Sequence, residues 1–320
     1  IRIMQKGVKF RIYPNKEQQT IINQTLGCCR LIYNKGLAMR NEAYQNGNKI
    51  GYSQTSAMLT DLKKSDDFAF LKAVDSIALQ QSLRDLDRGF VNFFQKRASH
   101  PTFKSKHNHH QSYRTINQGD NIRIVGKYIK LPKLEFVKIR QTMGVEKINN
   151  VTIERTPTNK YFAVLNVKFE PQPMSNKGGK IGIDVGIKEF YSDSNGKVVY
   201  NPKYLEKSMR KLIREQRKLS RKEKGSTNRN KQRVKVALVH EKITNQRNDF
   251  LQKQSTMLIR ENQTICIEDL KVKNMMRNHK LAQHIGSASW SKFFDMLSYK
   301  SIWYGNDIVK VPTMYPSSQT

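Results

Sequence analysis

Two acidic side chains interrupt apolar stretches that are typical of buried strands. Asp184 lies in the stretch 180–190 and Glu268 in the stretch 264–270, 84 residues further along the chain. A carboxylate inside a strand is costly unless it is paired or binds a metal ion. Acids at the ends of adjacent strands can share Mg²⁺, which takes oxygen ligands and can bind both the attacking and the leaving oxygen of a phosphodiester. The pattern therefore favours a metal site, although simple pairing with nearby lysines remains an alternative.

The elements around the two acids are those that an RNase H-like sheet requires. Asn195-Gly196 predicts a hairpin turn after the first acidic strand, and residues 203–258 read as two long basic helices separated near 225–228. The second acidic strand follows these helices. A helix over 289–304 and a short strand over 307–311 close the pattern.

The first half of the chain has a different organisation. Residues 8–13 alternate apolar and cationic side chains, which indicates a half-buried strand. Residues 18–94 show helical periodicity, with breakers near 46–48 and 65–67 and a final helix over 76–94. After Pro101, short alternating runs predict a small β-barrel that the first strand completes. These runs are 121–125, 128–131, 151–154 and 161–169.

The net charge indicates a polyanionic partner. Lys and Arg number 58 against 26 Asp and Glu, which leaves +32, while 14 Phe and 13 Tyr argue against a disordered chain. No apolar run approaches the ~18 residues of a membrane span. Three cysteines, two of them adjacent, cannot form a disulfide framework. We therefore expect a nucleic-acid-binding protein of a reducing compartment, with no membrane partner.

Several basic and aromatic residues are candidates for contact with RNA, because cations bind phosphates and rings stack on unpaired bases. They lie on the first strand and in the extended segment after Pro101: Lys9, Arg11, Phe103, Lys104, Lys106, Tyr113 and Arg114. The alternative is that these are exposed loops and core aromatics.

Uncharged polar residues of the helical region are candidates for reading DNA base edges, which Gln, Ser and Thr side chains can do. They are Tyr52, Ser53, Ser76, Gln80 and Gln81. Ser76 and Gln80 share one helical face, whereas Leu79 and Leu83 of the same helix occupy the core side. The alternative is that the two glutamines are ordinary helix-surface residues that do not contact DNA.

Motifs in a fixed order along nearly the whole chain resemble the TnpB family, the transposon-encoded RNA-guided DNA endonucleases related to type V CRISPR effectors. These motifs are Lys9–Pro14, Arg30–Asn34, Leu83–Arg88 with Phe93-Phe94, Pro101–Lys106, Gln111–Arg114, Leu131–Leu134, Gly182–Gly186, Ile267–Leu270 and Trp303–Gly305. Each motif is weak alone, and their order and spacing make the resemblance specific.

The resemblance implies an α+β multi-domain chain. A wedge β-barrel comprises residues 1–13 and 111–176, a helical recognition domain 14–110, and an RNase H-like (RuvC) α/β nuclease domain 177–320. Asp184 and Glu268 then correspond to the first and second catalytic carboxylates, with Mg²⁺ as cofactor in a two-metal site. The implied partners are one guide RNA derived from the transposon end and double-stranded target DNA next to a short motif. The protein is expected to be a monomer in the prokaryotic cytoplasm, at the nucleoid when bound to DNA.

The C-terminal end departs from the family pattern. Family members continue after the stretch matching 316–320 with Cys-x-x-Cys zinc pairs and a third carboxylate, and neither is present in these 320 residues. Zn²⁺ is therefore expected only in that absent part. Two expectations remain open. Either the chain of a nuclease continues beyond Thr320, or a shortened, nuclease-deficient relative acts as an RNA-guided DNA-binding repressor.

Overall fold

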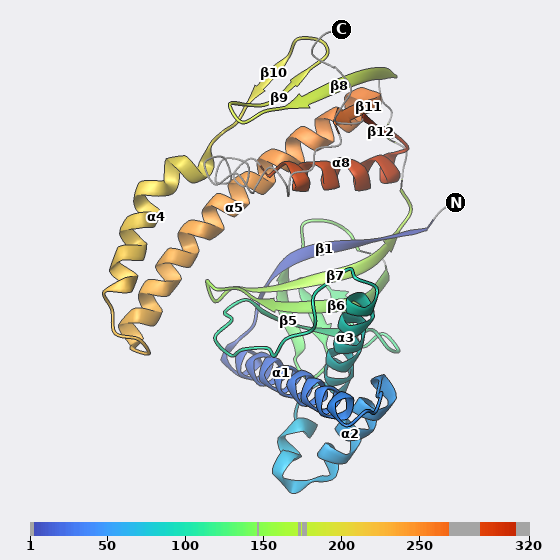
Figure 1. Ribbon diagram of the computed structural model, residues 1–320, viewed down its shortest axis with the longest axis vertical. Helices are drawn as coiled ribbons and strands as arrows, with labels where there is room; N and C mark the ends of the chain where they lie inside the picture. Colours follow the sequence, from blue (N-terminus) through green and yellow to red (C-terminus); the bar gives the residue numbers. More distant parts are fainter. Residues whose placement is uncertain (1–2, 146, 172–173, 175–177, 269–288, 312–320) are drawn as a thin grey trace. The chain divides into compact units, whose positions relative to one another are not determined.

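The computed structural model describes residues 3–145, 147–171, 174, 178–268 and 289–311, which form two compact units (Figure 1). Unit 1 is Ile1–Glu170 and unit 2 is Pro171–Thr320. Of the residues named above, Asp269, Leu270 and 316–320 lie outside the described part. Within that part, no helix is long and apolar enough to cross a membrane.

Unit 1 begins with one strand, continues through a helical segment and ends in six strands. The helical segment contains α1 (Lys16–Gln45), α2 (Tyr52–Lys64), a 3₁₀ helix η1 (Asp66–Lys72) and α3 (Ser76–Phe94). The strands are β1 (Met4–Tyr13), β2 (Gln111–Ile116), β3 (Arg123–Val125), β4 (Tyr128–Leu131), β5 (Glu135–Arg140), β6 (Lys147–Arg155) and β7 (Tyr161–Phe169).

Local chemistry explains where the helices of unit 1 begin. Asn15 caps α1, accepting a hydrogen bond from the Gln18 backbone N–H while the Gln18 side chain accepts from the Asn15 N–H. Asp75 caps α3 by accepting from the Ile77 backbone N–H at 2.9 Å. The predicted breaks near 46–48 and 65–67 are confirmed, as is the helix over 76–94.

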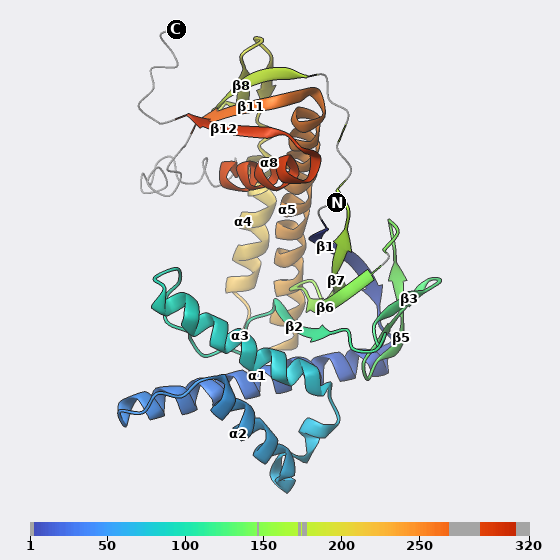
Figure 2. The same ribbon diagram turned by 90° about the vertical axis from the view of Figure 1, so that its right-hand side faces the viewer.

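The strands of unit 1 form one antiparallel sheet in the order β2-β6-β7-β1-β5-β4-β3. The sheet is curled into a half-barrel (Figure 2), where the sequence predicts a small barrel. β1 is central in it, because the chain returns after the helical segment to pair on both sides of β1. The strand β5 has no counterpart among the strands expected from sequence.

The core of unit 1 lies between this sheet and its helices. Buried strand residues such as Ile12, Val137 and Leu165 form one cluster with Ile22 of α1 and Leu79 of α3. The opposite face of the sheet carries the alternate residues of each strand, as the period of two requires.

Unit 2 contains a second, mixed sheet with helices on one face. Its elements are β8 (Gly179–Val185), β9 (Glu189–Asp193), β10 (Val198–Tyr200), α4 (Tyr204–Ser220), α5 (Thr227–Glu261), β11 (Asn262–Glu268), α8 (Trp290–Tyr304) and β12 (Asp307–Val311). The strand order is β10-β9-β8-β11-β12. β8, β11 and β12 are parallel, and the hairpin β9–β10 runs antiparallel beside β8.

One face of this sheet packs on helices α5 and α8 (Figure 2). Ile183 of β8 and Ile267 of β11 join a buried cluster with Leu258 of α5 and Phe293 of α8. Helices α4 and α5 also form a hairpin with its own small core, which includes Leu212 and Val239. The two long basic helices predicted from sequence are confirmed.

One strand predicted from sequence divides in two. The apolar stretch 180–190 forms β8 and the start of β9, with a turn at 186–188. Gly186 allows this turn, because a Cβ there would lie 2.8 Å from the Glu189 carbonyl oxygen. A longer straight strand would have removed the hairpin that borders Asp184.

Candidate functional site

Strand register places Asp184 and Glu268 side by side. Ile183 of β8 is registered with Ile267 of the parallel strand β11. Asp184 and Glu268 follow these two residues, so they occupy neighbouring positions on strands about 4.8 Å apart. The 83 intervening residues include a hairpin and two long helices that return the chain to the same sheet.

Both acids lie away from the packed side of the sheet. Ile183 and Ile267 are buried against α5 and α8, so the next residue on each strand faces the other side. Asp184 is exposed and Glu268 is half-buried. Both stand at the carboxyl ends of parallel strands, which is where α/β sheets commonly bind ligands. Two carboxylates in this arrangement can hold a hard divalent cation between them.

The hairpin β9–β10 supplies further polar groups on the same side. Ser192 is registered with Asp184, and its hydroxyl donates to Glu189 Oε2 at 3.2 Å. Sequence reasoning missed Ser192 and Glu189. The signal for them is Gly186, since counting across the turn that it allows sets the register of β9 on β8.

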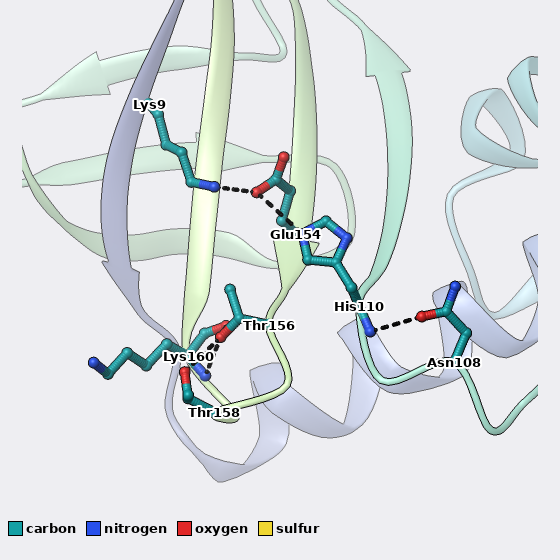
Figure 3. Close-up of polar contacts among 7 residues, drawn as sticks. All are labelled: Lys9, Asn108, His110, Glu154, Thr156, Thr158 and Lys160. Carbon is teal, nitrogen blue, oxygen red and sulfur yellow. Dashed lines mark hydrogen bonds and ion pairs between the residues drawn. The ribbon is translucent and has the colours of Figure 1, made fainter. Parts of the chain in front are cut away.

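The predicted RNA-contacting residues of β1 lie on the sheet face opposite the core. Lys9 forms an ion pair with Glu154 of β6, and His110 Nε2 lies 4.0 Å from the same carboxylate (Figure 3). The Lys9 ammonium is 4.6 Å from the Phe162 ring centroid, and the Arg11 guanidinium is 5.1 Å from it. These residues form one basic and aromatic group on β1, β6 and β7.

The candidates just after Pro101 are all exposed, and one of them is also fixed by contacts with α1. Phe103, Lys104 and Lys106 are exposed. Lys104 is held by Asn34, whose side chain pairs with both the N–H and the carbonyl of Lys104 at 2.8 and 3.0 Å. Its ammonium lies 4.1 Å from the Tyr33 ring centroid, and burial lowers the pKa of Lys104. Lys104 is thus exposed but held in place by α1, whereas for Phe103 and Lys106 only exposure is established.

Tyr113 and Arg114 on β2 are also engaged within unit 1. Tyr113 is buried in the core, and burial raises the pKa of its hydroxyl. Arg114 donates to Asp85 and, at 3.3 Å, to Gln81, both on α3. These contacts attach the sheet to α3.

The candidates for reading DNA come together on α2 and α3. Ser76 and Gln80 are exposed on one face of α3. Arg84 continues that face one turn further, and its guanidinium lies 4.3 Å from the Tyr52 ring centroid. Ser53 is exposed beside Tyr52, whereas Gln81 is buried and accepts from Arg114. Sequence reasoning missed Arg84, which the i, i+4 spacing from Gln80 could have indicated.

Family models match two parts of the chain. Residues 157–279 match OrfB_IS605, described as "Probable transposase", and residues 4–49 match HTH_OrfB_IS605, described as a helix-turn-helix domain. In the structure the second segment contains β1 and α1.

Two curated relatives align with almost the whole chain. A Streptomyces pristinaespiralis protein named "Putative RNA-guided DNA endonuclease" is 40% identical over 99% of this chain and 79% of its own length. The Escherichia coli K12 protein "Putative RNA-guided DNA endonuclease InsQ" is 33% identical over 98% of this chain and 82% of its own.

A solved structure has a similar fold. The cryo-EM structure of a Cas12f1–sgRNA–target DNA complex contains a chain that aligns with a TM-score of 0.53 and 12% identity. The alignment covers 97% of this chain and 89% of that one. At this identity the likeness concerns the fold, which is mixed α/β. The full-length similarity to the two curated relatives decides the family, and the chain belongs to the TnpB family.

Proposed function

We propose that this protein is an RNA-guided DNA endonuclease that makes metal-dependent double-strand breaks beside a short DNA motif. The observation that carries the nuclease assignment is the strand register, which places Asp184 and Glu268 at neighbouring positions on the side of the sheet away from α5 and α8. The names of the relatives and the charge of +32 support the RNA-guided part.

The donor set fits Mg²⁺, because carboxylate oxygens are the ligands that this ion prefers. Bound there, the ion would activate a water molecule and stabilise the charge on the leaving oxygen of the phosphodiester. Asp184 and Glu268 would hold it from two hydrogen-bonded strands. Among the described residues no group of three or more His, Cys, Asp and Glu is arranged to hold a metal. The proposal takes the remaining protein ligand from the third carboxylate that the family resemblance implies.

The domain organisation belongs to the same proposal. Unit 2 would be the RNase H-like (RuvC) nuclease domain, and the parallel strands β8, β11 and β12 beside an antiparallel hairpin support this. In unit 1, residues 1–13 with 111–176 would be the wedge and residues 14–110 the recognition domain. The guide RNA would contact the basic residues of β1, and one protein would bind one RNA.

Selection of the DNA motif is assigned to α2 and α3. Ser76 and Gln80 offer uncharged groups to base edges, while Arg84 beside Tyr52 offers a cation for a phosphate or a guanine. This surface is supported by the convergence of exposed residues from two helices.

The test replaces each acid without changing its size. Asp184→Asn and Glu268→Gln, in protein purified with its bound RNA, should each lower the rate of Mg²⁺-dependent cleavage of a matched plasmid by at least about 100-fold. Guided DNA binding in a gel-shift assay should be retained. Asp307→Asn is the matched control, because Asp307 is registered with Thr264, at the far end of β11 from Glu268.

Two outcomes would contradict the proposal. Cleavage that persists in both acid variants would remove these residues from the catalytic role. Guided binding without any cleavage by the unsubstituted protein would instead support an RNA-guided repressor. Mn²⁺ binding followed by electron paramagnetic resonance distinguishes a lost metal site from a lost DNA contact.

A further inference from the structure

The outer face of four strands in unit 1 is unusually rich in exposed aromatic side chains. Tyr13 of β1, Tyr128 of β4 and Phe136 of β5 are 45%, 48% and 46% exposed, and Val125 of β3 is 50% exposed. The alternate residues of these strands, such as Ile12, Ile129 and Val137, form the core. The solvent-exposed face of a sheet normally carries polar residues. The exposed rings therefore indicate that this face binds a partner.

Strand pairing arranges these rings in rows with cations. Tyr13 is registered with Lys138, Lys138 with Tyr128, and Tyr128 with Val125, so one row crosses all four strands. In the next row, Phe136 is registered with Lys130, and Lys130 with Arg123. Neighbouring strands are about 4.8 Å apart, so each ring lies directly beside a cation.

The charges on this face repel one another in the isolated protein. Arg11 is directly opposite Arg140 on the neighbouring strand, and Arg123 is directly opposite Lys130. Like charges at directly opposed positions of a sheet are destabilising. Glu135 provides partial compensation, because its carboxylate lies 3.8 Å from the Lys130 ammonium. A bound polyanion would relieve the repulsion, which makes phosphate groups the fitting occupant.

Two of the cations also lie within cation–π distance of a ring. The Lys130 ammonium is 6.0 Å from the Phe136 ring centroid, and the Arg11 guanidinium is 5.4 Å from that of Tyr13. A ligand with alternating flat rings and phosphates would match this arrangement, since bases stack on aromatic side chains while the backbone follows the cations. A fully paired duplex hides its base faces and matches it poorly.

We propose that this face binds unpaired RNA nucleotides by stacking. We call it the stacking face and define it by three aromatic residues, four cationic residues and one aliphatic residue of β1, β3, β4 and β5. These are Tyr13, Tyr128, Phe136, Arg11, Arg123, Lys130, Lys138 and Val125. The choice of RNA over DNA rests on the proposed function, and the Tyr13 and Tyr128 hydroxyls provide partners for a ribose 2′-OH. The single-strand preference rests only on the exposed rings.

The test removes two rings and keeps apolar bulk. Tyr128→Leu/Phe136→Leu is compared with Tyr44→Leu/Phe94→Leu, which removes one exposed Tyr and one exposed Phe from α1 and α3 of the same unit. Fluorescence anisotropy measures the Kd of the full chain for a labelled, non-self-complementary RNA 20-mer. Duplex RNA and single-stranded DNA of the same sequence are measured in parallel, and salt is raised until duplex binding is weak.

The stacking-face pair should weaken single-stranded RNA binding by roughly tenfold or more, while the control pair changes it little. The slope of log Kd against log salt should be unchanged, because stacking involves no counterion release. Lys138→Gln/Lys130→Gln should instead reduce that slope by up to about 1.4, at about 0.7 per phosphate contact on a single strand.

Three results would overturn the proposal. These are an unchanged Kd in Tyr128→Leu/Phe136→Leu, an equal loss in the control pair, or an equal loss for duplex RNA. Single-stranded DNA that binds as tightly as RNA and loses as much would overturn the assignment to RNA. Since the assay contains neither target DNA nor Mg²⁺, its outcome is independent of whether Asp184 and Glu268 support cleavage.

Folding of the variants is checked by their melting temperatures. A second measurement needs no substitution: 4-thiouridine RNA is photocrosslinked to the unsubstituted protein, and the attached peptides are identified by mass spectrometry. Crosslinks at Tyr13, Tyr128 or Phe136 support the proposal, and crosslinks confined to other surfaces contradict it.

Discussion

Lys300 is a lysine buried between α8 and α5 in unit 2. It is 4% exposed, and its ammonium donates to Ser255 Oγ and Thr256 Oγ1 at 2.7 Å and to the Gln252 carbonyl at 3.1 Å. These partners are neutral. Burial therefore lowers the pKa of Lys300 to about 8. The charged form is tolerated in the folded state at a cost.

This lysine predicts a pH dependence of stability. The ordinary pKa is 10.5, so between about pH 8 and pH 10.5 the unfolded chain binds more protons at this position than the folded chain. The free energy of unfolding should therefore gain a contribution of roughly 1–3 kcal/mol as pH rises through this window. Lys300→Met should remove that rise.

Urea unfolding of the unsubstituted protein and of Lys300→Met is measured at pH 7.5 and pH 10. The change in the free energy of unfolding between the two pH values is compared for the two proteins, so that the contributions of other titrating groups cancel. Lys292→Met is the control, because Lys292 is an exposed lysine of the same helix. A pH dependence that is identical in Lys300→Met and the unsubstituted protein would contradict the lowered pKa.

At the scale of elements, helix α1 contains two glycines, Gly27 and Gly36, and only Gly36 lies in the contact with α3. A Cβ at Gly36 would lie 2.8 Å from Leu83 Cδ2 and 3.0 Å from Leu86 Cδ2, both on α3. A Cβ at Gly27 would meet nothing within 4 Å. The same substitution should thus have opposite effects at the two positions.

Gly27→Ala should raise the free energy of unfolding by about 0.5–1 kcal/mol, because alanine costs less conformational entropy than glycine in a helix. Gly36→Ala should lower it, since forcing an extra methyl group into a packed interface costs about 1–3 kcal/mol. Thermal and urea unfolding of the two variants check this. Equal stabilisation by both would show that α1 and α3 can move apart without cost.

Element boundaries were largely predictable, because they depend on local residues. The helical periodicity of 18–94, with its breaks and its final helix over 76–94, predicts α1 and α3 well, and the strands 128–131, 161–169 and 307–311 are confirmed at both ends. The strand β5 was not predicted from sequence. It has only two buried residues, Val137 and Ile139, and its other residues are glutamate, phenylalanine, lysine and arginine, so its apolar alternation is short.

At the scale of the whole molecule, the cores of the two units share no described residue. The buried clusters of unit 1 draw on residues from Phe10 to Val167, and those of unit 2 on residues from Ile181 to Leu297. Each unit thus has its own hydrophobic core, which is the physical requirement for independent folding.

A fragment of residues 1–170 should therefore fold by itself. We expect cooperative thermal unfolding and dispersed amide signals in its NMR spectrum. A fragment of residues 1–110, which retains the helices but lacks β2 to β7, is the control and should fail to unfold cooperatively because the buried strand residues of the core are missing. A molten 1–170 fragment would show that unit 1 requires unit 2.

The sequence alone predicted a polyanionic partner, and it determined the two acidic strands and most helices. Net charge is a sum over residues, and helix caps and apolar periodicity depend on residues a few positions apart. All three can therefore be read from the sequence without knowledge of the fold. The family resemblance extended this to an expected function, because the order of its motifs runs along nearly the whole chain.

Only the tertiary structure decided which residues meet. Ser192 faces Asp184, Arg84 lies beside Tyr52, and Lys130 is opposite Arg123, each through pairing or packing that no local pattern encodes. The same holds for Arg114, which looks like an RNA contact in sequence and forms an ion pair with Asp85 in the fold. Strand register and helix packing are set by non-local burial, because a shift of one residue would move every core side chain to the solvent face.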